Sequence, residues 1–150
     1  PTRDTELESR VVLNHVMRRA LDGGPLSLYR NQHCIRDFVY VDDAVRAICA
    51  AAVTEPLTPG GKYIAGSGEG HSLREIVNDI ARLVENLGYP PVEVLFDDAA
   101  TLEPVEWREF VADYRRLHSA TGWQPLTTLH QGIEATLNAF LDGGNGGQTR

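Results

Sequence analysis

A glycine-rich segment, KYIAGSGEGHS at residues 62–72, comes closest in this sequence to a ligand-binding motif. Backbone amides in such a loop, where a strand passes into a helix, can hydrogen-bond a pyrophosphate. The dinucleotide-binding fingerprint G-x-G-x-x-G, however, requires a third glycine where this sequence has His71. The acidic pair Asp97–Asp98 also follows the loop by about 30 residues, against an expected ~20. We therefore predict a plain connection from strand to helix, with cofactor binding as the alternative.

Other familiar catalytic sets are missing from the sequence. Ser67 lies in Gly-Ser-Gly and not in a G-x-S-x-G elbow. The five histidines do not pair with one another or with a cysteine at metal-ligand spacing. The adjacent carboxylates Asp42–Asp43 and Asp97–Asp98 fit a helix cap and a strand end better than a separated acid–base pair. We predict no metal site and no self-contained catalytic set.

Composition limits the class of protein and its partners. The chain has 150 residues, of which 42% are hydrophobic and 23% charged, as is typical of one globular domain. Its net charge of −7 argues against nucleic-acid binding, because a phosphate backbone needs a basic surface. No apolar run reaches the ~18 residues of a transmembrane helix, so no membrane association is expected. Only two cysteines favour a reduced, cytoplasmic location.

Hydrophobic periodicity predicts an alternation of helices and strands. Helices are expected over residues 10–22, from a cap at Asp42 or Asp43 to 53, over 72–87, shortly after Asp113, and over 129–141. Strands are expected at 26–29, 38–41, 62–65 and 92–96, with 110–111 as a further candidate. Ser72 with Glu75, and Thr128 with Gln131, have the spacing of capping boxes. The fold class is therefore α/β (α+β-like), a small mixed sheet with packed helices.

The sequence IRDFVYVDDA at residues 35–44 resembles a signature, R-D-F-V-Y-V-D-D, of the NAD(P)-dependent nucleotide-sugar epimerase/dehydratase family, the extended short-chain dehydrogenases/reductases. The resemblance continues on both sides and covers about residues 7–141. It includes the stretches RVVLNHV, ALDGGPLSLYRNQHCIRDF, KYIAGSGEGHSLREI and EPVEWREFVADYRRLHSATGWQPLTTLHQGI.

The resemblance implies that this chain is the C-terminal half of such an enzyme. Residues 1–142 would form its substrate-binding portion and 143–150 a disordered tail. The family's N-terminal Rossmann domain binds NAD or NADP and carries a Tyr-x-x-x-Lys pair, and here no tyrosine is followed four residues later by lysine. We expect the Rossmann domain, which these residues lack, to be a partner of this chain, and we expect this chain to bind no cofactor itself. We also expect the enzyme to form a homodimer.

The resemblance also implies a set of residues that bind a nucleoside diphosphate sugar. Arg36 matches the arginine that contacts the diphosphate, or would alternatively form an ion pair with Asp42 or Asp43. Phe38 would be a pocket wall or plain core. The remaining substrate-binding candidates are Leu26, Leu28, Tyr29, Asn14, Arg10 and Arg108.

Some positions depart from the family pattern. Glu103 replaces a second phosphate-binding arginine, and Arg108 is the candidate to supply that charge, or else part of a solvated face. The implied reaction is that of an epimerase, a dehydratase or a 4-ketoreductase, with features that lean towards the ketoreductases of deoxysugar pathways. The alternative is a stand-alone sugar-nucleotide-binding module, or a fragment, without activity.

Overall fold

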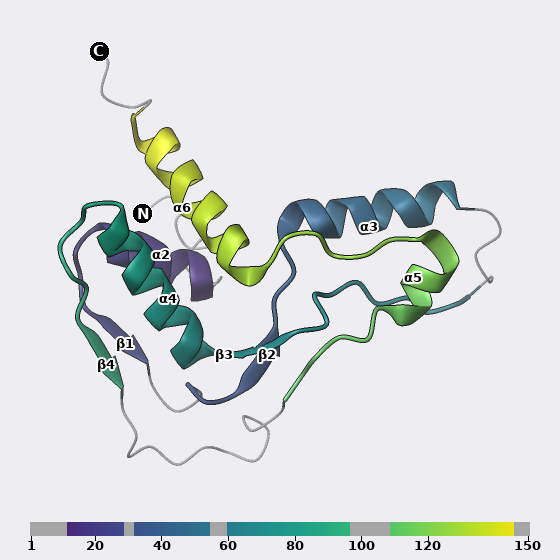
Figure 1. Cartoon of the computed structure of the whole chain (residues 1–150), viewed down its shortest axis with the longest axis horizontal. Coiled ribbons are helices and arrows are strands. Elements are labelled where there is room, and N and C mark those ends of the chain that lie inside the picture. Colours follow the sequence, from purple (N-terminus) through teal and green to yellow (C-terminus); the bar gives the residue numbers. More distant parts are fainter. Residues whose placement is uncertain (1–11, 29–31, 55–59, 97–108, 146–150) are drawn as a thin grey trace.

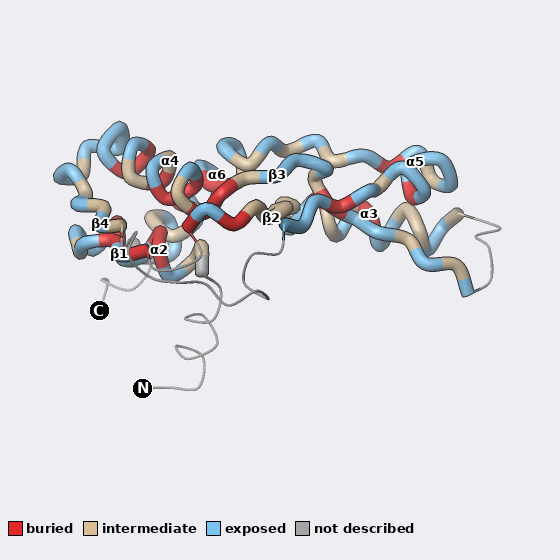
Figure 2. The backbone as a smooth tube through the Cα atoms, turned by 90° about the horizontal axis from the view of Figure 1, so that it is seen from below, coloured by how far each residue is buried: buried red, intermediate tan, exposed pale blue. Residues whose placement is uncertain are grey.

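The computed structural model describes residues 12–28, 32–54, 60–96 and 109–145, which form an elongated α/β arrangement (Figure 1). Three helices and one pair of strands gather at one end, and two helices lie at the other. A second pair of strands and several extended segments connect the ends (Figures 1 and 2).

The larger core lies at the first of these ends. Its elements are α2 (Val12–Leu21), β1 (Leu26–Leu28), α4 (Leu73–Asn86), β4 (Val94–Phe96) and α6 (Leu129–Asn145). Strands β1 and β4 pair in parallel, with Leu26 opposite Val94. The buried apolar residues that these elements contribute are Val16, Met17, Ala20, Leu26, Leu28, Leu73, Ile76, Val77, Ile80, Leu83, Val84, Ile133 and Leu137.

Helix α4 shows why the sequence forms helices where it does. Its apolar residues recur every three or four positions, so that one face of the helix is buried in the larger core. The Ser72 hydroxyl accepts a hydrogen bond from the amide of Glu75 at 3.2 Å, and the Glu75 carboxylate accepts one from the Ser72 amide at 2.8 Å. The predicted capping box is thus confirmed, and Thr128 with Gln131 forms the equivalent contacts at the start of α6.

A smaller core lies at the other end of the molecule. Helices α3 (Val41–Val53) and α5 (Arg115–Thr121) pack together around Ala47, Leu117 and Trp123. The rings of Tyr114 and Trp123 meet edge to face, with centroids 5.7 Å apart. Between the two ends, β2 (Ile35–Asp37) and β3 (Gly70–Ser72) form an antiparallel pair.

The α/β class, the helices and the strands β1 and β4 agree with the sequence predictions, but other strands do not. The prediction of a strand at 38–41 is wrong, because the strand in this region, β2, lies at Ile35–Asp37 and α3 already begins at Val41. Residues 62–65 and 110–111 form no strand. Phe110 only donates one backbone hydrogen bond to the carbonyl of Ile35, at 3.1 Å. A segment becomes a strand here only where another segment pairs with it in register, and in both strand pairs that segment is distant in the sequence.

Three further details differ from expectation. The expected single mixed sheet is two separate strand pairs within the described residues. Neither Asp42 nor Asp43 caps α3, whose N-cap is Tyr40 without a side-chain hydrogen bond. Helix α6 extends to Asn145, so residues 143–145, placed in a disordered tail, end that helix. No helix in the part of the chain that the structure describes is long and apolar enough to cross a bilayer.

Candidate functional site

Asn14 and Phe38, two of the predicted substrate-binding residues, come together at a hollow of about 490 Å³. The hollow lies between α2, the segment that connects β2 to α3, and the start of α6. Its lining is mainly apolar, with hydroxyl and amide groups at a few points. It consists of Leu13, Asn14, Met17, Phe38, Val39, Tyr40, Val41, Thr127, Thr128, Leu129, Gly132, Ile133 and Thr136. Phe38 also packs against the larger core, and its role as a wall of a substrate pocket stays a prediction.

Leu26 and Leu28 lie at a different hollow, on the other side of α2. Both side chains are buried in the larger core and line a space of about 260 Å³. His15 and Arg19 of α2 supply polar groups to this space, and Arg19 donates a hydrogen bond to the carbonyl of Pro25 at 2.6 Å. The sequence analysis did not select these two residues for a site, although their spacing of four places them on one helix face.

Arg36 lies on β2 and lines neither of these two hollows. Its side chain is half-buried, and Nη1 donates a hydrogen bond to the carbonyl of Ile35 at 2.8 Å. The alternative role for Arg36 was an ion pair with Asp42 or Asp43. The Asp43 carboxylate pairs with Arg46 and accepts hydrogen bonds from the amides of Leu126 and Thr127, and the ion pair of Arg36 with Asp42 stays a prediction.

Three predicted binding residues, Arg10, Tyr29 and Arg108, lie outside the described residues, as does Glu103. Their assignment stays a prediction. The structure therefore brings Asn14 and Phe38 to one hollow, and Leu26 and Leu28 to another. Arg36 lies on β2, two residues before Phe38.

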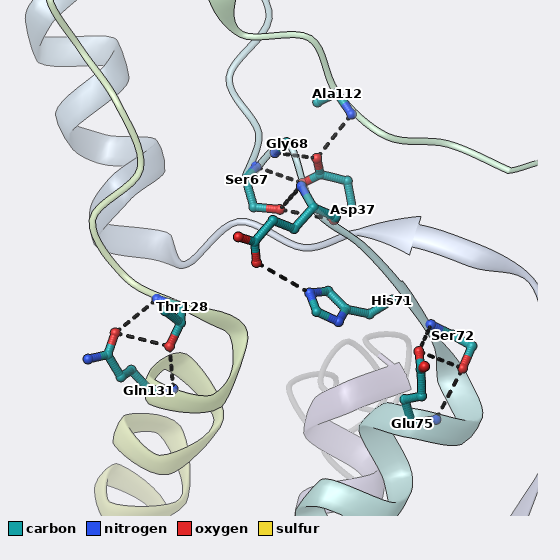
Figure 3. A network of polar contacts seen from close by, with 10 residues as sticks. Asp37, Ser67, Gly68, His71, Ser72, Glu75, Ala112, Thr128 and Gln131 are labelled. Atoms are coloured by element: carbon teal, nitrogen blue, oxygen red, sulfur yellow. Dashed lines mark hydrogen bonds and ion pairs between the residues drawn. The ribbon is translucent and has the colours of Figure 1, made fainter.

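The sequence analysis missed Asp37, the residue next to Arg36. Its carboxylate accepts four hydrogen bonds, from the Ser67 amide at 2.7 Å, the Ser67 hydroxyl at 2.9 Å, the Gly68 amide at 2.8 Å and the Ala112 amide at 3.0 Å (Figure 3). We call these four residues the Asp37 cluster. The sequence offered two signals, the place of Asp37 in the family signature and the donor-rich Gly-Ser-Gly segment, and neither says which anion that segment binds.

The Asp37 cluster explains the glycine-rich segment. Two backbone amides that a pyrophosphate would need donate their hydrogen bonds to the Asp37 carboxylate of the protein itself. The amide end of α4 is similarly occupied by the Ser72–Glu75 capping box. The segment does connect to α4, as predicted, but through extended chain and the short strand β3. These residues therefore do not fit a dinucleotide phosphate.

The glycines of this segment are required by close packing. A Cβ atom on Gly66 would collide with the Cβ of Ala112, and one on Gly70 would collide with Ile35. Gly68 has a φ of +75°, which side-chain-bearing residues rarely adopt, and its Cβ would lie 2.8 Å from the ring of Tyr114. The glycine pattern therefore fits the segment closely against β2 and residues 110–114.

Comparison with known proteins identifies relatives of the chain. The sequence pattern of a family described as GDP-mannose 4,6 dehydratase matches residues 1–136. A dTDP-glucose 4,6-dehydratase of Neisseria meningitidis is 31% identical over 128 residues, which cover 82% of this chain and 36% of the relative.

Solved structures show the same fold. A UDP-glucose 4-epimerase from Thermus thermophilus, in complex with NAD, aligns with a TM-score of 0.66 and 31% identity, over 87% of this chain and 40% of that one. An epimerase from Methanothermobacter thermautotrophicus aligns with a TM-score of 0.75 and 23% identity, over 91% of this chain and 38% of that one.

These likenesses are to NAD-dependent epimerases and dehydratases of the extended short-chain dehydrogenase/reductase type. The chain belongs to the GDP-mannose 4,6 dehydratase family within that group. It spans between about a third and two-fifths of the length of these relatives.

Proposed function

We propose that the chain is the substrate-binding part of a longer NAD(P)-dependent enzyme that modifies a nucleoside diphosphate sugar as an epimerase, dehydratase or 4-ketoreductase. The observation that carries this proposal is the match of residues 1–136 to a family whose relatives include a dTDP-glucose dehydratase and a UDP-glucose epimerase. Hydride transfer would be supplied by NAD or NADP, held by the remaining part of the enzyme. This chain would bind and orient the sugar nucleotide.

The proposed binding surface combines an apolar hollow with a cation. The hollow at Asn14 and Phe38 has the size and mainly apolar lining of a small-ligand site, with a few polar groups to fix orientation. Arg36, on the strand that leads into Phe38, would bind the diphosphate, because a guanidinium can hydrogen-bond two phosphate oxygens at once. Leu26 and Leu28 line the separate hollow on the other side of α2, so their part in binding the base, like the parts of Tyr29, Arg10 and Arg108 in this site, stays a prediction.

An apolar face on α3 supports a partner domain. Val41, Val45 and Ile48 recur at spacings of four and three, so they share one face of the helix, and they are 62%, 51% and 70% exposed. Ala47, by contrast, is buried in the smaller core. Exposed apolar side chains on one face mark an interaction surface. We propose that the cofactor-binding domain covers this face, while the homodimer stays a prediction.

Arg36→Ala tests the proposed substrate site. In the longest natural form of the protein, we expect binding of the matching nucleoside diphosphate to weaken by about 1.5–3 kcal/mol, because a charged hydrogen bond is lost. Isothermal calorimetry with UDP, dTDP, GDP and CDP would measure the change and identify the base. Arg82→Ala removes an exposed arginine of α4 that pairs with Asp79 and should leave the dissociation constant unchanged. An unchanged constant for Arg36→Ala would remove Arg36 from the site.

Ile48→Ala tests the proposed domain interface. If a second domain covers α3, this truncation should lower the free energy of unfolding of the longest natural form by about 1.5–3 kcal/mol, because a buried apolar side chain is lost. Chemical denaturation would measure the change. The matched control is Asn78→Ala at an exposed position of α4. A change for Ile48→Ala within about 0.5 kcal/mol, as at ordinary surface positions, would contradict a covered α3 face.

A further inference from the structure

The Asp37 cluster binds together three segments that are distant in the sequence. Asp37 lies on β2, Ser67 and Gly68 in the turn before β3, and Ala112 in the segment before α5 (Figure 3). We infer that Asp37 is a positioning residue for substrate binding, a built-in anion that fixes the strand carrying Arg36 and leading into Phe38. This inference rests on the proposed function, since it concerns the same binding surface.

The geometry of the cluster requires a carboxylate. Oδ1 accepts hydrogen bonds from the amide and the hydroxyl of Ser67, and Oδ2 accepts them from the amides of Gly68 and Ala112. Each oxygen atom therefore faces two donors. An asparagine would place an NH₂ group against one of these donor pairs, and each pair contains at least one backbone N–H, which cannot accept a hydrogen bond. Only an ionised acid satisfies all four donors.

The charge of Asp37 is balanced by dipoles within the described residues, where its partners are three backbone N–H groups and one hydroxyl. Successive backbone amides of a turn form a concave site that binds anions. Asp37 fills this site from within the protein. The site should therefore accept a small free anion when the Asp37 side chain is removed.

The cluster acts on the binding surface through β2. Consecutive residues of a strand point to opposite faces, so Arg36 and Asp37 lie on opposite sides of β2. On one side of Asp37 in the chain, Ile35 accepts a hydrogen bond from the Phe110 amide at 3.1 Å. The segment 110–112 is thus bound to β2 at two points, and Gly70 pairs with Asp37 across the ladder with β3. These contacts fix β2, and with it the backbone of Arg36.

Chemical rescue by formate tests the inference. In the longest natural form of the protein, Asp37→Ala leaves four donors directed at an empty anion site. We expect it to weaken binding of the preferred nucleoside diphosphate, whichever of UDP, dTDP, GDP and CDP that is, by about 2- to 30-fold, the range for residues that act through others. Formate should restore part of that affinity relative to chloride at equal ionic strength. It should also raise the melting temperature of this variant.

Three control variants separate positioning from general stability. Asp37→Asn should not respond to formate, because its side chain fills the site while presenting N–H groups to donors. Asp113→Ala removes an exposed carboxylate of the same segment that pairs with Arg115, and it should show no formate response. Arg36→Ala should lose affinity without any rescue, because its anion site is already filled by Asp37.

The outcomes distinguish this inference from the proposed function. If the wild-type protein binds none of the nucleotides, the proposed function fails, whereas a formate-dependent melting temperature of Asp37→Ala would still support the filled anion site. If Asp37→Ala folds only in formate, the anion site is supported. If Asp37→Ala binds nucleotide like the wild type, the positioning role is overturned. If formate changes neither affinity nor melting temperature, or the variant fails to fold in both salts, the anion site is overturned.

Discussion

Replacing Asp43 with alanine should lower the free energy of unfolding by about 2–4 kcal/mol, because two backbone amides lose their acceptor at about 1–3 kcal/mol each, whereas the pair with the half-exposed Arg46 adds less. Asp43 is 1% exposed, and its carboxylate pairs with Arg46 and accepts hydrogen bonds from the amides of Leu126 at 3.1 Å and Thr127 at 2.9 Å. The Asp43 carbonyl also accepts a hydrogen bond from Trp123 Nε1 at 3.0 Å. Alanine would leave Arg46 and two backbone amides without their acceptor. Urea denaturation at pH 7 would measure the loss.

Asp42 provides the matched control, because it lies in the same first turn of α3 but is exposed. Asp42→Ala should cost less than about 1 kcal/mol, the ordinary contribution of an acidic residue near a helix N-terminus. Equal losses for the two variants would mean that the buried contacts of Asp43 add nothing beyond its charge on α3.

The contribution of Asp43 should also depend on pH. Burial by itself would raise the pKa of Asp43, but hydrogen bonds from Arg46 and from the amides of Thr127 and Leu126 outweigh it, and the pKa is lowered overall. A carboxyl group with a lowered pKa in the folded state stabilises the protein fully above its unfolded pKa of about 3.9. That contribution is lost as the pH falls through the folded pKa. The free energy of unfolding of Asp43→Asn should therefore fall less steeply than that of the wild type as the pH is lowered below about 4.

The sequence predicted those features whose causes lie within one or two helical turns. The helix at Leu73–Asn86 and its Ser72–Glu75 box follow from spacings of three and four residues. The position of β2 could not be predicted in this way, because its partner in β3 lies more than thirty residues away. Arg36 and Asp37 are both charged and lack the alternation of a half-buried strand, yet both residues belong to β2.

The same limit applies to the acidic residues. Asp43 has the position of a helix cap in the sequence, yet its acceptor oxygens bind amides more than eighty residues further along the chain. The place of Asp37 in the family signature and the donor-rich Gly-Ser-Gly segment could not be connected from the sequence, since the donors of Asp37 come from 30 and 75 residues away. Asn14, Phe38 and Arg36 were selected because the sequence resembles a known family. Spacing alone would not have selected them.

The segment that Asp43 binds connects the two cores. Trp123 is buried in the smaller core, and the amides of Leu126 and Thr127 donate hydrogen bonds to the Asp43 carboxylate. Helix α6 begins two residues after Thr127. Leu137, further along α6, is fully buried in the larger core. A continuous and hydrogen-bonded connection of this kind predicts that the two ends of the molecule unfold together rather than separately.

Leu137→Ala tests this coupling. The truncation should cost about 2–5 kcal/mol, because it removes buried methyl groups and leaves a cavity in the larger core. In a Trp107→Phe background, Trp123 is the only tryptophan and reports on the smaller core. The fluorescence of Trp123 and the far-ultraviolet circular dichroism should then show one shared denaturation midpoint, lowered equally by Leu137→Ala. Leu126→Ala, at a position 65% exposed, is the control and should leave both midpoints nearly unchanged. A fluorescence midpoint that stays fixed while the dichroism midpoint falls would show that the two cores unfold independently, and that the contacts of Asp43 stabilise only the smaller one.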